Sequence, residues 1–114
     1  MSNPAQKSVT IDIAPGSAAD PYRYVPAILL PPATGEKAER LGLPADVPAQ
    51  VWPARDTAGF AIAAAITLRE QAPGSVAVVY MHNPKGFESP NGLQPRPTKN
   101  VDRNGKPLFM YVVG

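Results

Sequence analysis

The side chains that perform most protein chemistry are scarce in this sequence. Its 114 residues include no cysteine and a single histidine, His82. A chain without cysteine has no thiolate nucleophile, no disulfide and no cysteine-ligated zinc or iron–sulfur centre. The acid nearest to His82 in sequence is Glu88. Since a general base needs an orienting carboxylate and a reacting group beside it, we interpret His82 as a strand-end residue hydrogen-bonded to the turn at Asn83 and Pro84.

The carboxylates and glycines are too scattered to indicate a metal or phosphate site. Each aspartate stands alone along the chain, and none belongs to a D-x-D pair, a calcium loop or an H-x-E spacing. The glycine-rich phosphate loops and the G-x-S-x-G elbow are also absent from the sequence. We therefore predict a protein that is not an enzyme, with no catalytic residues, no cofactor and no metal.

Proline is the unusual component, at 15 of 114 residues, where about 5% is typical. Because proline lacks an amide donor and is poorly tolerated inside helices and central strands, its positions limit where regular structure can form. Only residues 33–43 and 54–72 are free of proline for long enough to hold a helix of several turns. The length suits one small domain, 1–114, with 44% hydrophobic residues to form its core.

Alternating or apolar runs predict strands at 8–13, 22–30, 75–82 and 107–113. Pro26 suggests that the second is an edge strand, is bulged or is divided into two short strands. Residues 54–72 are ambiguous. Alanine content and the stop at Pro73-Gly74 favour a helix over about 57–72, whereas the large side chains all fall on even positions, as in a strand. We predict an α+β domain: a small antiparallel sheet, this helix packed on it, and proline-rich extended arms. The alternative is a mainly β fold. Such a helix has no polar stripe, so the sheet would cover one side and a partner the other.

A long polar connection, 83–106, separates the last two predicted strands and is rich in basic residues. Residues 75–114 carry five basic and two acidic groups. Cations neutralise phosphates, and an aromatic ring among them can stack on a base. The alternative function is therefore a nucleic-acid-binding module that uses Lys85, Phe87, Arg96, Lys99, Arg103 and Lys106.

The preferred function is a non-enzymatic protein–protein interaction or assembly module. Proline-interrupted segments present aromatic and aliphatic side chains, and their stiffness lowers the entropic cost of binding. Small accessory, decoration and inhibitor proteins are built in this way. The predicted protein-binding residues are Tyr22, Tyr24, Ile28, Leu30 and Trp52.

No apolar run approaches the ~20 residues of a membrane span, and the first ten residues lack the apolar region of a secretory signal. We expect no membrane contact and a soluble protein, intracellular or within an assembled particle. The partner is expected to be another protein or a second copy of the chain, with nucleic acid as the alternative.

Overall fold

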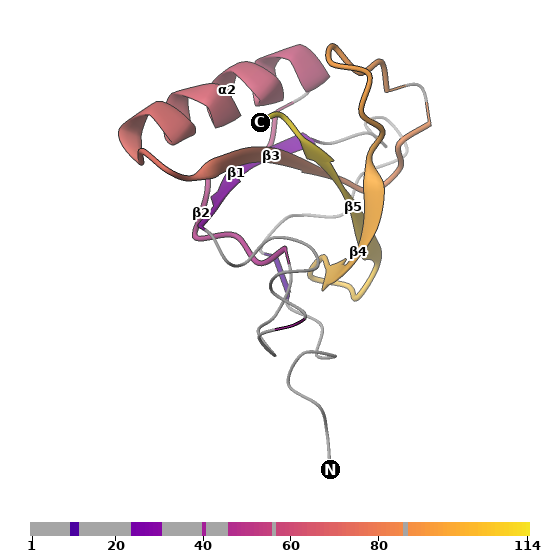
Figure 1. Cartoon of the computed structure of the whole chain (residues 1–114). Coiled ribbons are helices and arrows are strands. Elements are labelled where there is room, and N and C mark those ends of the chain that lie inside the picture. Colours follow the sequence, from indigo (N-terminus) through magenta and orange to yellow (C-terminus); the bar gives the residue numbers. More distant parts are fainter. Residues whose placement is uncertain (1–9, 12–23, 31–39, 41–45, 56, 86) are drawn as a thin grey trace.

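The computed structural model describes residues 10–11, 24–30, 40, 46–55, 57–85 and 87–114. A helix packs against a five-stranded antiparallel sheet with strand order β2-β1-β3-β5-β4 (Figure 1), so the predicted α+β fold is confirmed. The elements are β1 (Tyr24–Leu29), β2 (Gln50–Val51), α2 (Ala58–Gln71), β3 (Val76–Met81), β4 (Arg96–Val101) and β5 (Pro107–Val112).

The central strand β3 joins two hydrophobic clusters, one on each face of the sheet. Successive strand side chains point to opposite faces, so Val79 and Met81 pack under the helix while Val78 and Tyr80 pack on the other side. β3 pairs with β1 along its whole length and with β5 from Val78 to Met81. Because both faces and both edges are covered, β3 is apolar throughout, and this is why the sequence predicts it so clearly.

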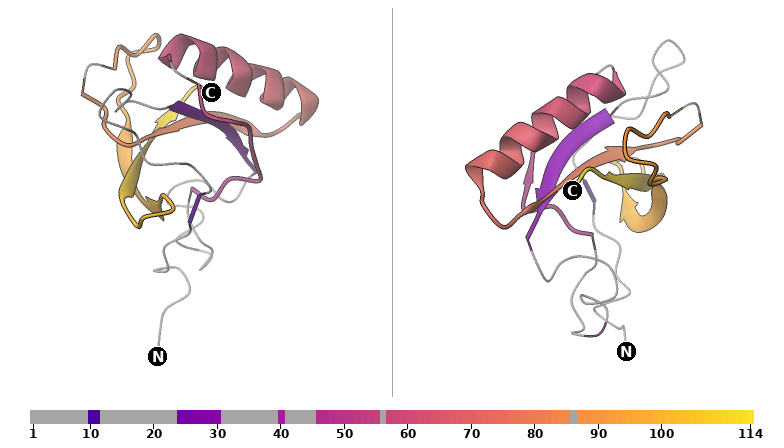
Figure 2. Two further views of the ribbon diagram at one scale, coloured as in Figure 1. Left: turned by 180° about the vertical axis from the view of Figure 1, so that it is seen from behind. Right: turned by 45° about the horizontal axis from the view of Figure 1, so that its top comes forward.

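Helix α2 confirms the helical interpretation of residues 57–72 and shows that the strand interpretation is wrong. Thr57 is the N-cap, and its side chain accepts a hydrogen bond from the backbone N–H of Phe60 at 3.3 Å. The face toward the sheet consists of buried Ala61, Ala65 and Leu68. Since two of these side chains are methyl groups, the helix lies close on β1 and β3, as Figures 1 and 2 show.

The expectation that Pro26 makes its segment an edge strand, a bulge or two short strands is wrong. β1 is one continuous strand that lies between β2 and β3 and pairs with β3 over its whole length. The carbonyl of Pro26 accepts a hydrogen bond from the backbone N–H of Trp52 at 3.0 Å. A strand residue points its nitrogen and carbonyl to the same side. The missing N–H of Pro26 would therefore point toward β2, which has only two residues and a short hydrogen-bond ladder. For this reason the pairing of β1 with β3 is intact.

The prediction of a continuous loop over 83–106 is also wrong, since it contains β4. This strand is polar, has β5 as its neighbour in the sheet and lies at the edge of the strand order (Figure 2). Its register shifts between Pro97 and Val101. An edge strand tolerates proline and exposed polar residues. For this reason β4 lacks the apolar pattern by which strands are recognised in a sequence.

Several predicted segments lie wholly or partly outside the described residues. Of the strand expected at 8–13, only Thr10 and Ile11 are described, and the N–H of Ile11 donates to the carbonyl of Val101 at 2.8 Å. Tyr22 is not among the described residues. Within the ranges given above, no helix is long and apolar enough to cross a membrane.

Candidate protein-binding groove

A groove of about 420 Å³ lies beside the edge strand β2. This volume falls within the range of about 300–1,000 Å³ that is usual for ligand sites. None of the described lining residues is charged, and only one, a threonine, is polar. The lining residues are Thr10, Ile11, Val47, Pro48, Val51, Trp52 and Pro53.

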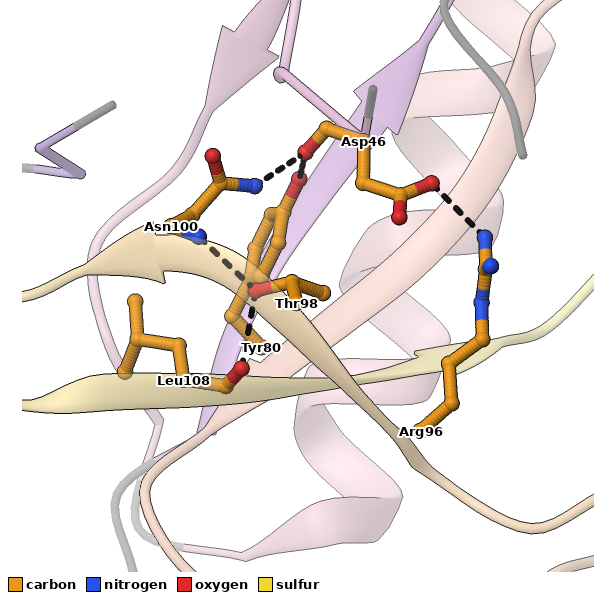
Figure 3. A network of polar contacts seen from close by, with 6 residues as sticks. All are labelled: Asp46, Tyr80, Arg96, Thr98, Asn100 and Leu108. Atoms are coloured by element: carbon orange, nitrogen blue, oxygen red, sulfur yellow. Dashed lines mark hydrogen bonds and ion pairs between the residues drawn. The ribbon is translucent and has the colours of Figure 1, made fainter. Parts of the chain in front are cut away.

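The wall formed by residues 47–53 is anchored at its start by Asp46. This residue is 5% exposed and has a positive φ of 61°, a conformation that aspartate adopts more readily than most residues. Its backbone carbonyl accepts two hydrogen bonds, from the Tyr80 hydroxyl at 2.5 Å and from Asn100 Nδ2 at 2.6 Å (Figure 3). The central strand and the edge strand β4 therefore both hold the residue that precedes the groove.

The Asp46 side chain adds a third contact to this network. Its carboxylate accepts a hydrogen bond from Arg96 Nη2 at 2.7 Å, and the Arg96 side chain is 45% exposed (Figure 3). Because solvent screens the arginine, the ion pair itself contributes little stability. Burial, and then the Asp46 charge, raise the pKa of Tyr80 far above its usual value. The Tyr80 hydroxyl therefore stays protonated and remains a donor.

The far end of the wall is tied to β1 by backbone hydrogen bonds. Ala49 N–H donates to the Ile28 carbonyl at 2.8 Å, and Arg55 N–H donates to the Tyr24 carbonyl at 2.7 Å. The bond from Trp52 to Pro26 lies between them. With both ends held and φ restricted at two prolines, the groove is formed before any ligand arrives.

The structure separates the predicted protein-binding residues into two groups. Trp52 lines the groove, and Leu30 is 49% exposed just after β1. Tyr24 and Ile28 are core residues, 9% and 2% exposed, and are not available to a partner. They are buried because β1 is an interior strand, contrary to the interpretation of Pro26. The proline-rich run around Trp52 indicated an extended wall, but nothing in the sequence indicated that Ile11 and Val47 would share it.

The predicted nucleic-acid-binding residues do not form a platform of rings and cations. Phe87 packs against Tyr111 with ring centroids 4.7 Å apart and against Tyr24 at 6.3 Å, so its ring serves the core rather than a base. Arg96 is engaged by Asp46. The other predicted cations have exposed positions. They are Lys85, Lys99, Arg103 and Lys106.

His82 is hydrogen-bonded to a carboxylate, not to the turn that follows it. Its Nε2 donates to Asp102 Oδ2 at 2.7 Å. Asp102 is 1% exposed, and its other oxygen accepts hydrogen bonds from the backbone N–H groups of Asn104 and Lys106. Burial acts to raise the pKa of Asp102, but the hydrogen bonds from Lys106, His82 and Asn104 outweigh it and lower the pKa. This pair stabilises the β4–β5 turn.

The His82–Asp102 pair is not arranged for catalysis toward the groove. Neither residue is among the described lining residues, and His82 Nδ1 is buried without a hydrogen-bond partner in the described structure. A general base must be within reach of the proton that it removes, and a ligand in the groove would not be within reach of His82. Among the described residues, no group of three or more histidine and acidic side chains is placed to hold a metal ion.

Comparisons of the chain with protein-family models, curated proteins and solved structures gave no match. The basis for inferring a function is therefore the geometry of the chain itself. The groove beside β2 is a concave, uncharged surface in its described part.

Proposed function

We propose that this chain is a non-enzymatic protein-interaction module whose groove beside β2 receives an extended, uncharged segment of a partner protein. One observation carries the proposal: the chain has 11 basic and 9 acidic residues, yet none of the described residues that line the groove is charged. The buried centres of protein interfaces are likewise depleted in charge and enriched in aromatic residues. Such a module serves as an accessory, decoration or inhibitor subunit, in solution or within an assembled particle.

The shape of the groove favours an extended polypeptide as the ligand. Its wall is itself extended chain that contains an edge strand of only two residues, Gln50–Val51. A partner segment lying along this wall would place apolar side chains against Trp52, a residue type that often dominates binding energy. Since the wall is held at both ends, little entropy is lost in ordering it.

The second class, a nucleic-acid-binding module, relies on the basic residues near β4. Without an aromatic platform, these residues would act mainly through phosphate contacts, which weaken steeply as salt increases. The affinity for a dT20 oligonucleotide, measured at low and at high salt, therefore tests this second function.

Trp52 makes the test direct because it is the only tryptophan in the chain. Peptides selected from a phage-displayed library on the immobilised protein should shift the Trp52 emission on titration, with saturation. Pro53→Asp puts a charge on the exposed rim of the groove and should weaken binding at least tenfold. Pro90→Asp is the matched control, since Pro90 is exposed in the loop after β3 and does not line the groove. Peptides that bind both variants equally and leave the Trp52 emission unchanged would contradict the proposal, as would salt-sensitive binding of dT20 alone.

A further inference from the structure

The outer face of α2 is a second surface, separate from the groove. Gly59, Phe60, Ala63 and Thr67 are exposed on it, and Phe60 is 71% exposed. No charged residue occurs in the helix before Arg69. Helices that face solvent normally carry charged and polar residues on the outer side. Here the exposed ring of Phe60 lies beside small uncharged residues on the same helix, so this face offers an apolar surface for contact.

We propose that two copies of this chain associate through α2, with the two helices antiparallel about a two-fold axis. The small residues Gly59, Ala63 and Thr67 recur every four positions and form one row along the helix. Such a row allows another helix to approach closely. Phe60 borders the row and supplies the apolar contact area.

Two exposed charges at opposite ends of the helix indicate that the partner is a second copy and that the helices are antiparallel. Arg55 lies beside Phe60 in a surface hollow at the start of the helix, and Glu70 lies in the last turn. Both are exposed, and neither side chain forms an ion pair or a hydrogen bond with another described residue. Phe60 and Glu70 are ten residues apart, roughly 15 Å along the helix axis.

Antiparallel pairing places Glu70 of one copy beside Arg55 and Phe60 of the other, and the two-fold axis repeats this contact. The first turn of α2 contains no acidic residue, so an incoming carboxylate also meets the positive end of the helix dipole. In this arrangement Ala63 of each copy lies against Thr67 of its partner. A parallel arrangement would instead bring like charges together at each end.

The extent of the contact sets the expected affinity. A helix of 14 residues is roughly 21 Å long, so one helix face buries less than the ~800 Å² per partner of a standard interface. We therefore expect a reversible dimer that dissociates on dilution through the micromolar range.

Charge exchange tests this pairing with the full chain in sedimentation equilibrium. The unaltered protein should show a concentration-dependent dimer. R55E alone and E70R alone place like charges at both contacts and should each weaken the dimer at least tenfold. An equimolar mixture of R55E and E70R should restore it, because every contact in the mixed dimer joins opposite charges. The matched controls K85E and E88R carry the same charge changes on exposed residues outside α2 and should leave the dimer unchanged.

Phe60→Ser provides a second variant that does not depend on charge and should also weaken the dimer at least tenfold. A chain that stays monomeric up to millimolar concentration, or a dimer that neither R55E, E70R nor Phe60→Ser weakens, would overturn the inference. So would an R55E and E70R mixture that associates no better than either variant alone. These outcomes do not bear on the groove, because none of the altered residues lines it.

Discussion

The Tyr80 hydroxyl on the central strand donates a hydrogen bond of 2.5 Å to the backbone carbonyl of Asp46, 34 residues earlier in the chain. Tyr80 itself is fully buried in the cluster on the face of the sheet opposite α2. The bond therefore connects the core of the domain with the first residue of the groove wall. Changes at Tyr80 should be measurable both in stability and in the groove.

Tyr80→Phe should lower the free energy of unfolding by about 1 kcal/mol at neutral pH, because it removes one hydrogen bond from a buried carbonyl that retains Asn100 as a donor. Urea denaturation measures this difference. The Trp52 emission of the folded variant should also become easier to quench with acrylamide, since the wall loses one anchor. A variant as stable as the original chain, with unchanged quenching, would show that the bond does not support the groove.

The same pair of proteins should respond differently to alkaline pH. The folded-state pKa of Tyr80 is raised, mainly by burial. The stability that its hydroxyl contributes is therefore fully present below the unfolded pKa of about 10. Above that pH the unfolded chain releases the proton while the folded chain retains it. The stability advantage over Tyr80→Phe should then shrink by about 1.4 kcal/mol per pH unit and reverse near pH 11. An advantage that stays constant from pH 8 to pH 11 would contradict the assignment.

Asp102→Asn should alter the stability at acid pH. The folded-state pKa of Asp102 is lowered, so the charged form adds stability above the unfolded pKa of about 3.9, and this stability is lost as the pH falls through the folded value. The original chain should thus be more stable than the variant at pH 7, and the difference should shrink below about pH 4. Urea titrations at pH 7 and pH 3 measure it. Glu88→Gln, at an exposed residue, is the control and should show no such change.

Two glycine substitutions should change stability in opposite directions. Gly105 in the β4–β5 turn has a φ of +80°, which strains any residue with a Cβ, so Gly105→Ala should cost about 1 kcal/mol or more. Gly59 lies in the first turn of α2 with open space around it, so Gly59→Ala should stabilise the fold by up to about 1 kcal/mol. Thermal unfolding of dilute samples compares them. Equal effects at the two sites would mean that backbone strain is not the cause.

Local patterns were sufficient for four elements of the fold, because the strand predicted at 22–30 is observed as β1. β3 and β5 are short apolar runs between turn residues, and α2 has a threonine cap, many alanines and a Pro-Gly stop. These signals depend on residues close in sequence. A strand that is buried on both faces is a short continuous apolar run, and a helix cap involves only the residues at the end of the helix. The apolar outer face of α2 was also foreseeable, since the helix lacks a polar stripe wherever the sheet lies.

Long-range contacts decided the rest. The polar edge strand β4, the interior position of Pro26 and the bond between His82 and Asp102 each depend on which segments meet in space. Asp102 is 20 residues beyond His82, and Asp46 is 34 before Tyr80. Composition showed that this chain has few reactive groups and is rich in proline. Only folding brings residues 10–11 and 47–53 together into one groove, because strand pairing and core packing, not neighbouring residues, determine which side chains share a surface.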